Sequence, residues 1–132
     1  MASIQGYIDE ARQPRVAITV HGARGELTLD AVIDTGFDGD LCLPVPVAIE
    51  LGLELYGAQR VQLADGSIRS ELVFIGKAGF AGKPSQTQEV EILLTEAGDA
   101  LIGVGFLADW RLEIDFPKKT VRLYPRPHQG EP

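Results

Sequence analysis

Apolar residues at every second position recur along this chain, and this alternation constrains the fold more than any other feature. In RVAITVH they stand at 16, 18 and 20, and in ELTLDAVI they stand at 27, 29 and 31. A period of two is typical of β-strands with one buried face, because successive side chains point to opposite sides of the sheet. With the turn sequence GARG between the two segments, residues 15–33 predict a β-hairpin.

Two more hairpins follow from the same pattern. RVQLADGSIRSELVFIG at 60–76 has Asp65-Gly66 at its centre, which is a strong hairpin turn signal. RLEIDF and TVRLY flank Pro117, Lys118 and Lys119, so the two lysines are expected in an exposed hairpin turn. The sequence therefore predicts an all-β fold class.

Helical and loop segments are few. PVPVAIELGLE predicts one short helix that ends at Gly52, and a second short helix is expected near 104. GFAGKPSQ at 79–86 predicts a surface loop. We expect a single domain over residues 1–125, followed by a flexible C-terminal tail at 126–132.

Composition narrows the function classes. The 132 residues carry a formal net charge of -7, which argues against a nucleic-acid partner because phosphate binding needs clustered Lys and Arg. The longest apolar run, at 100–108, is too short to span a bilayer, so we expect no membrane association. Cys42 is the single cysteine; between two leucines it is expected to be buried, and a cytoplasmic location is the default.

AVIDTGFDG at 31–39 raises the question of chemistry. An apolar strand ends here in Asp34, Thr35 and Gly36, and a carboxylate at the inner end of a buried strand is costly. The residues alone leave two interpretations open. Asp34 either satisfies backbone N–H groups in a turn or serves as a reactive carboxylate, with Gly36 allowing close backbone approach.

Three segments together resemble the retropepsin-like aspartic protease family. AVIDTGFDGDLCLP resembles its catalytic loop, VQLADGSIRSELVFIG its flap hairpin, and ALIGVGFLADWRLEIDFPKKTVRL its closing segment. Their order and spacing agree across residues 15–124. The resemblance implies the acid-protease fold, a closed β-barrel with one or two short helices, in a homodimer without cofactor or metal.

In such a protease Asp34 would be the catalytic carboxylate. Peptide hydrolysis by this route needs two carboxylates that share one proton, one acting as base and the other as acid. Only one Asp-Thr-Gly is present, so the second carboxylate must come from a second copy of the chain. By the same resemblance, Thr35 would lock the two loops together and the backbone of Gly36 would meet substrate.

The resemblance also implies a set of substrate-binding residues for an extended peptide or protein segment. They are Phe37, Asp38, Ala64, Asp65, Gly66 and Ile102. Two positions depart from the family pattern. Phe37 replaces a residue that is commonly Ala or Ser, and Val104 replaces the Arg that partners Asp38 in retroviral members.

Three alternatives to an active peptidase each agree with part of the sequence. The first is a catalytically silent homodimeric module with the same fold that binds extended peptides. The second is a dinucleotide-binding fingerprint, suggested by Gly103, Gly105 and Ala108. The third is a calcium loop, suggested by the acidic residues of DTGFDGD, although Val45 stands where a bidentate Glu is required.

Overall fold

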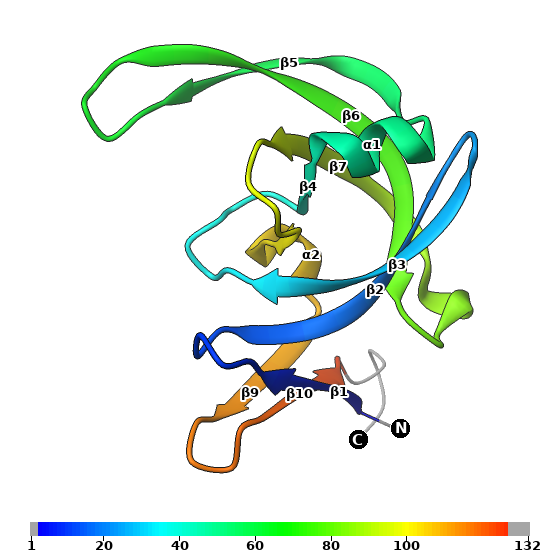
Figure 1. The fold of residues 1–132 in the computed structure, drawn as a ribbon, viewed down its shortest axis with the longest axis vertical. Helices are drawn as coiled ribbons and strands as arrows, with labels where there is room; N and C mark the ends of the chain where they lie inside the picture. The colour runs from blue at the N-terminus through cyan, green and yellow to red at the C-terminus, as the bar shows by residue number, and fades with distance from the viewer. Residues whose placement is uncertain (1–2, 127–132) are drawn as a thin grey trace.

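The computed structural model describes residues 3–126, and β-strands dominate it (Figure 1). The strands are β1 (Ile4–Ile8), β2 (Pro14–Gly22), β3 (Gly25–Ile33), β4 (Leu41–Pro44), β5 (Glu54–Gln62), β6 (Ile68–Phe80), β7 (Gln88–Thr95), β8 (Leu101–Ile102), β9 (Trp110–Asp115) and β10 (Thr120–Pro125). Two short α-helices, α1 (Val45–Leu51) and α2 (Val104–Leu107), and one 3-10 turn at Pro84–Gln86 complete the described part. The sequence predicted an all-β class with one or two short helices, and the described residues are mostly β with two short α-helices.

All three predicted hairpins are present as antiparallel pairs, β2–β3, β5–β6 and β9–β10. Lys118 and Lys119 are exposed in the β9–β10 turn, as predicted. The loop predicted at 79–86 is shorter than expected, because β6 continues to Phe80 and pairs there with Ile18 of β2. Phe80 is 2% exposed, so its burial in the core extends the strand.

The short helix α1 ends where the sequence placed its stop. Gly52 adopts a left-handed conformation with φ 66° and ψ 54°, and its N–H donates to the carbonyls of Ala48 and Ile49. Only glycine takes this conformation without strain, so it terminates the helix cleanly.

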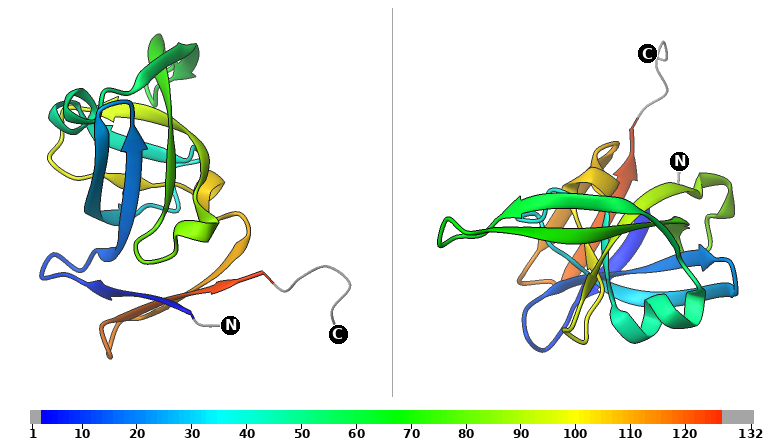
Figure 2. Two further views of the ribbon diagram at one scale, coloured as in Figure 1. Left: turned by 90° about the vertical axis from the view of Figure 1, so that its right-hand side faces the viewer. Right: turned by 90° about the horizontal axis from the view of Figure 1, so that it is seen from above.

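Pairing joins the strands in the order β5-β6-β7-β4-β8-β3-β2-β1-β10-β9. An additional pairing of β6 with β2 closes a ring through β3, β8, β4 and β7. The β5–β6 hairpin extends from one end of this ring, and β1, β10 and β9 continue the sheet from the other (Figures 1 and 2). Four strands, β1, β4, β7 and β8, were not predicted.

The ring encloses the hydrophobic core. Its fully buried side chains come from strands far apart in sequence and include Ile18, Leu41, Leu43, Ile92, Ile102 and Leu123. An aromatic cluster extends this core toward the second helix. Phe80 contacts Phe106 of α2 and Trp110 of β9 edge to face, at centroid distances of 5.3 and 4.8 Å.

Cys42 is not the buried residue that was predicted. Leu41 and Leu43 point into the core at 0% exposure, whereas Cys42, between them on the strand, points to the opposite face and is half-buried. Partial burial raises the pKa of its thiol above the ordinary value. The alternation of side chains along β4, and not the apolar neighbours in the sequence, therefore determines which way Cys42 points.

The predicted tail at 126–132 lies outside the described residues except for Arg126. The backbone N–H of Arg126 donates to the carbonyl of Asp109 at 2.9 Å. Between residues 3 and 126, no helix is both long enough and apolar enough to cross a membrane.

The packing of the core predicts how the free energy of unfolding changes when a central side chain is shortened. Ile92→Ala on β7 should lower the free energy of unfolding by about 2–5 kcal/mol, because it leaves a cavity between β6 and β4. Ile49→Ala is the matched control, since that side chain is 63% exposed, and should change stability by no more than about 0.5 kcal/mol. Denaturant unfolding at one protein concentration measures both; equal losses would contradict the assigned core.

Asp9 organises the turn between β1 and β2. Its carboxylate accepts hydrogen bonds from the N–H groups of Ala11 and Gln13 and from the Nε of Arg15, the last at 2.6 Å. The Arg15 guanidinium is the main cause that holds the pKa of Asp9 below its ordinary value of 3.8, and the N–H of Gln13 adds to it.

A lowered folded-state pKa contributes stability above the unfolded value, and that contribution is lost as pH falls through the folded value. The melting temperature of the wild type should therefore fall below pH 3.8 more steeply than that of Asp9→Asn. Glu10→Gln removes the same charge from an exposed neighbour and should keep the wild-type acid slope. Thermal melts across the acid range decide this; identical slopes for the wild type and Asp9→Asn would contradict it.

Candidate active site

Asp34 directly follows β3, whose last three residues, 31–33, are buried. The short strand β8 lies between β3 and β4, parallel to the first and antiparallel to the second. The chain must therefore pass from β3 to β4 over the end of β8, and residues 34–40 make this passage. The N–H of Asp34 donates to the carbonyl of Ile102 at 2.9 Å, which fixes the start of the loop against β8.

Three further backbone hydrogen bonds join the loop to the start of α2. Gly103 N–H donates to the carbonyl of Asp40 at 2.9 Å, Val104 N–H to Phe37 at 2.8 Å, and Gly105 N–H to Gly39 at 3.0 Å. Each bond satisfies a loop carbonyl that would otherwise need water. The loop is thus held rigidly although its partners are distant in sequence.

Close approach of the two backbones requires small residues. A Cβ on Gly103 would collide with the carbonyl oxygen of Gly39 and would lie 2.7 Å from atoms of Phe37. A Cβ on Gly105 would meet Asp40 Oδ1 at 2.6 Å. The two glycines that suggested a dinucleotide fingerprint therefore serve the packing of this loop.

The Asp34 carboxylate is half-buried, and Thr35 and Gly36 are exposed at the tip of the loop. Asp34 Oδ1 accepts a hydrogen bond from the N–H of Gly36 at 2.9 Å, and the N–H of Phe37 donates to the Asp34 carbonyl at 3.1 Å. Asp34 therefore has the turn role that the sequence left open, because its carboxylate accepts a hydrogen bond from a backbone N–H group of the loop. The role involves a single carboxylate oxygen, Oδ1, beside the backbone carbonyl, and the half-buried side chain remains partly exposed.

Phe37 is accommodated by glycines on either side. Its ring lies where a Cβ on Gly39 or Gly103 would be, with closest atoms at 2.7 Å from each such position. The half-buried ring therefore packs within the loop and its α2 support. This explains how the chain tolerates a bulky residue beside Asp34.

Asp40 supports the far end of the loop. Its Oδ2 accepts a hydrogen bond from the backbone N–H of Glu91 on β7 at 3.0 Å. Sequence analysis missed this role because it did not predict β7. EVEILL at 89–94 carries a weak alternation that could have indicated the strand.

A cleft of about 430 Å³ lies between this loop and the β5–β6 hairpin. Of the predicted site residues, Phe37 and Asp38 line this cleft, whereas Asp34, Thr35 and Gly36 lie on the same loop without lining it. Residues that were not predicted complete the lining, namely Gly39, Asp40, Leu41, Gln59, Glu91 and Leu93. A second cavity of about 630 Å³ continues under the hairpin, past Cys42 and Val61. The hairpin therefore overhangs a surface that can hold an extended ligand.

The tip of the β5–β6 hairpin, at Ala64, Asp65 and Gly66, is exposed and does not line either cavity. Figure 1 shows the hairpin projecting beyond the 34–40 loop. Gly66 has φ +87°, and Asp65 Oδ1 accepts bonds from the hydroxyl and N–H of Ser67. The Ser67 hydroxyl is the main cause that lowers the pKa of Asp65, so the turn is a compact unit.

Ile102 does not lie where a ligand could touch its side chain. It is 0% exposed and packs in the core between β3 and β4, so its side chain does not line the cleft, and its substrate-binding role stays a prediction. Ile102 acts instead through its carbonyl, which accepts the hydrogen bond from Asp34.

Neither ligand-binding alternative finds structural support. Helix α2 has four residues and leads into the antiparallel β9–β10 hairpin, which leaves no parallel βαβ unit for a dinucleotide. Across residues 3–126, no group of three or more His, Cys, Asp or Glu side chains is placed to hold a metal ion.

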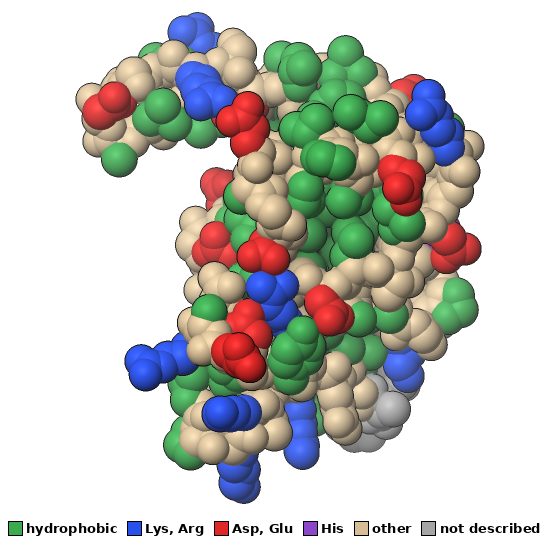
Figure 3. All heavy atoms as spheres, in the orientation of Figure 1, with side chains coloured by type: hydrophobic (Ala, Val, Ile, Leu, Met, Phe, Trp, Pro, Cys, Tyr) green, Lys and Arg blue, Asp and Glu red, His purple; other side chains and the backbone are tan. Residues whose placement is uncertain are grey.

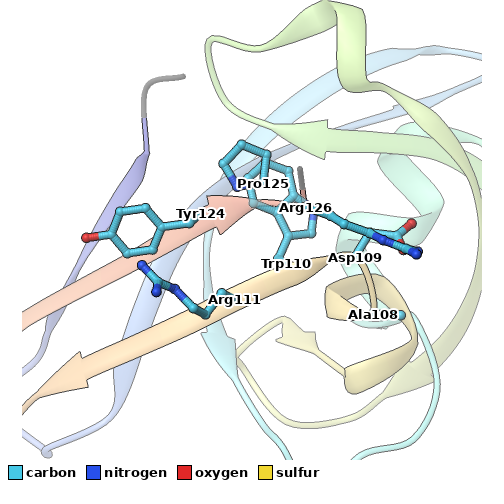
Figure 4. A pocket seen from close by; sticks show the side chains of 7 residues that line it. All are labelled: Ala108, Asp109, Trp110, Arg111, Tyr124, Pro125 and Arg126. Carbon is cyan, nitrogen blue, oxygen red and sulfur yellow. The ribbon is translucent and has the colours of Figure 1, made fainter. Parts of the chain in front are cut away.

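A third cavity of about 500 Å³ lies elsewhere, where β9 begins and β10 ends (Figure 4). Residues 108–111 and 124–126 line it. No residue of the 34–40 loop contributes to it, so it is separate from the candidate active site.

No protein-family model and no curated protein matches the sequence. Solved structures do match. A retropepsin-like aspartic protease from Rickettsia conorii superposes with a TM-score of 0.67 at 14% identity, over 92% of this chain and 90% of its own. The Simian Foamy Virus (mac) protease gives 0.52 at 15% identity, over 71% of this chain and 91% of its own.

The retroviral protease-like domain of Ddi1 from Leishmania major also matches, with a TM-score of 0.52 at 14% identity over 90% of this chain and 98% of its own. At these identities the comparisons establish the fold. The chain has the retropepsin-like fold, and the resemblance found in its sequence motifs is confirmed at that level.

The packing of the loop on α2 can be tested at Gly103. Gly103→Ala should destabilise the protein by about 1–3 kcal/mol, because the added Cβ displaces the loop backbone. Gly98→Ala is the control, since a Cβ there meets no atom within 4 Å. Chemical denaturation measures both variants. Equal stabilities would show that the loop is not tied to α2 as described.

Proposed function

We propose that this chain is an aspartic-type endopeptidase that acts as a two-fold homodimer, each copy contributing Asp34. The observation that carries the proposal is the placement of Asp34. It lies on a loop fixed by backbone hydrogen bonds to β8 and α2, and residues 37–40 of the same loop line a cleft under the long β5–β6 hairpin. The retropepsin-like fold supports the same conclusion.

The proposed reaction needs the two Asp34 side chains to share one proton. The ionised carboxylate takes a proton from a water molecule, whose oxygen attacks the peptide carbonyl carbon, while the protonated carboxyl donates to the carbonyl oxygen. The resulting diol collapses as the carboxyl that took the water proton gives it to the amine nitrogen, the C–N bond breaks, and a diol hydroxyl returns a proton to the other carboxylate, so the pair again shares one proton. Each chain supplies one group, so a single copy lacks half of the chemistry.

Other residues have positioning roles in this proposal. Thr35, exposed at the loop tip, would contact the second copy, and Gly36 offers its backbone to substrate. Phe37 and Asp38 form one wall of the cleft and Gln59 of the hairpin forms the other. An extended peptide fits such a groove because its main chain can pair with the hairpin edge.

The decisive variant is Asp34→Asn. Asn retains the shape and the acceptor for Gly36 N–H but cannot ionise, so cleavage of an unfolded peptide library should fall by at least about 10²–10⁴-fold. Asp115→Asn is the matched control. Asp115 accepts a bond from Lys118 N–H at the β9–β10 turn and lines neither cavity under the β5–β6 hairpin, so its loss of charge should leave cleavage largely intact.

Mass spectrometry of the products, between acid and neutral pH, measures both variants. Equal loss from both would contradict the assignment of Asp34. A wild-type protein that binds library peptides and cuts none would instead establish the silent binding module.

A further inference from the structure

The groove under the β5–β6 hairpin has one face of β7 as its floor. Val90 and Ile92 point into the core, at 2% and 0% exposure. Side chains alternate along a strand, so Glu91, Leu93 and Thr95 point to the opposite face. Glu91 lines the cleft of about 430 Å³, Thr95 lines the cavity of about 630 Å³, and Leu93 lines both. The two spaces are therefore neighbours along β7.

The smaller space is an acidic cleft. Asp38 and Asp40 of the 34–40 loop and Glu91 of β7 line it, and none of its described lining residues is Lys, Arg or His. Across residues 3–126, no hydrogen bond or ion pair holds the carboxylates of Asp38 or Glu91, both of which are exposed. Asp40 Oδ2 accepts the N–H of Glu91, which leaves its charge in place. The chain therefore does not neutralise the negative charge of this cleft itself.

The carboxylates of the acidic cleft suit a long organic cation. Figure 3 shows an open notch between the projecting hairpin and the body, with Asp and Glu side chains gathered on the body below it. Within residues 3–126, no three acidic, His or Cys side chains are placed to hold a metal ion. A Lys or Arg side chain is flexible and carries several N–H donors, so it can reach carboxylates that a small ion cannot bridge. Such charge-assisted hydrogen bonds are stronger than neutral ones.

The larger space is an apolar cavity. Its walls come mostly from apolar side chains of α1, β4, β7 and the hairpin, among them Val45, Val61 and Leu94. The charged pair in its lining is neutralised internally, because Arg69 Nε lies 3.1 Å from Glu71 Oε1. Unlike the acidic cleft, this cavity favours the burial of an apolar side chain.

We propose that the groove selects extended peptides in which a basic side chain stands two residues away from a large apolar one. The basic side chain enters the acidic cleft, and the apolar side chain enters the apolar cavity. Residues i and i+2 of an extended peptide lie on the same side, about 7 Å apart, which matches the repeat of β7 that separates the two spaces. The inference rests on the proposed function, because it names the substrate class of the same groove.

Peptides that differ at one position test the acidic cleft. Lys and Met side chains are of similar length, so their exchange changes charge more than size. The wild type should cleave a Lys peptide with a kcat/KM about tenfold above that of the Met peptide, and a Glu peptide should be the poorest of the three. Asp38→Asn/Glu91→Gln removes two charges from the cleft and should abolish the preference for Lys.

The matched control is Glu54→Gln/Glu89→Gln. It removes two charges from exposed positions that line neither space, so the preference for Lys should remain. The control is needed because a net charge of -7 attracts basic peptides to the whole surface. If the control pair abolished the preference as fully as the cleft pair, the general charge would be its source and the inference would be overturned.

Charge reversal in the cleft gives the sharper result. Asp38→Lys/Glu91→Lys should invert the order of the three peptides, so that the Glu peptide is cleaved best and the Lys peptide worst. A folding defect would lower the cleavage of all three peptides alike and cannot invert their order. An unchanged order in a folded variant would contradict the assignment of these two carboxylates.

The apolar cavity and the spacing are tested with a second peptide series. Cys42→Phe should fill the cavity and lower the preference for Leu over Ala at the apolar position about tenfold, whereas Cys42→Ser keeps the size of the side chain and should retain it. Spacings of one or three residues place the basic and apolar side chains on opposite sides of an extended peptide. Equal cleavage at all spacings would overturn the two-space arrangement.

Binding separates this inference from the proposed function. Fluorescence anisotropy with the Lys, Met and Glu peptides measures Kd for the wild type and for Asp34→Asn. Selective binding of the Lys peptide by a wild type that cuts nothing would establish the selectivity and overturn the peptidase. Cleavage without preference for Lys, or with a preference that Asp38→Asn/Glu91→Gln retains, would overturn the selectivity and leave the peptidase intact.

Discussion

The backbone hydrogen bonds between residues 37–40 and 103–105 are the constraint on which the rest of the site depends. They hold residues 34–40 against the start of α2. Between these two segments the chain forms the strands β4 to β8 and the helix α1. The geometry leaves no room for a side chain at Gly103. Because both segments continue from adjacent strands of one sheet, the position of Asp34 is determined by the sheet itself.

Sequence predicted the parts of this fold that local chemistry determines. Three hairpins follow from alternation and turn residues, and α1 follows from its glycine stop at Gly52. The strands that were missed depend on distant partners. β8 has two residues, and β1 carries Gly6, where a Cβ would strike the carbonyl of Arg15, so neither has an alternation that can be read alone.

The residues of the candidate site also divide into those that the local sequence identifies and those that depend on distant strands. Asp34, Phe37 and Asp38 were found because one continuous motif contains them, and they do lie on one loop. Gln59, Glu91 and Leu93 lie in the cleft only because strands distant in sequence pair with one another. Ile102 was assigned a binding role because it belongs to a motif, but its side chain packs in the core. A motif therefore identifies a loop reliably, whereas the direction of each side chain depends on the strand beside it.

The two ends of the sheet differ, and one of them contributes to the cleft beside the 34–40 loop. At one end β5 and β6 extend beyond the ring and overhang the cleft; at the other, β9 presents an unbroken edge. A chain with net charge -7 repels its own copies, so association must come from directed contacts and not from general attraction. If the two Asp34 carboxylates of a dimer work as a pair, the contacts that hold the two copies together also set the distance between these carboxylates, so a change at those contacts would alter the chemistry without touching the 34–40 loop.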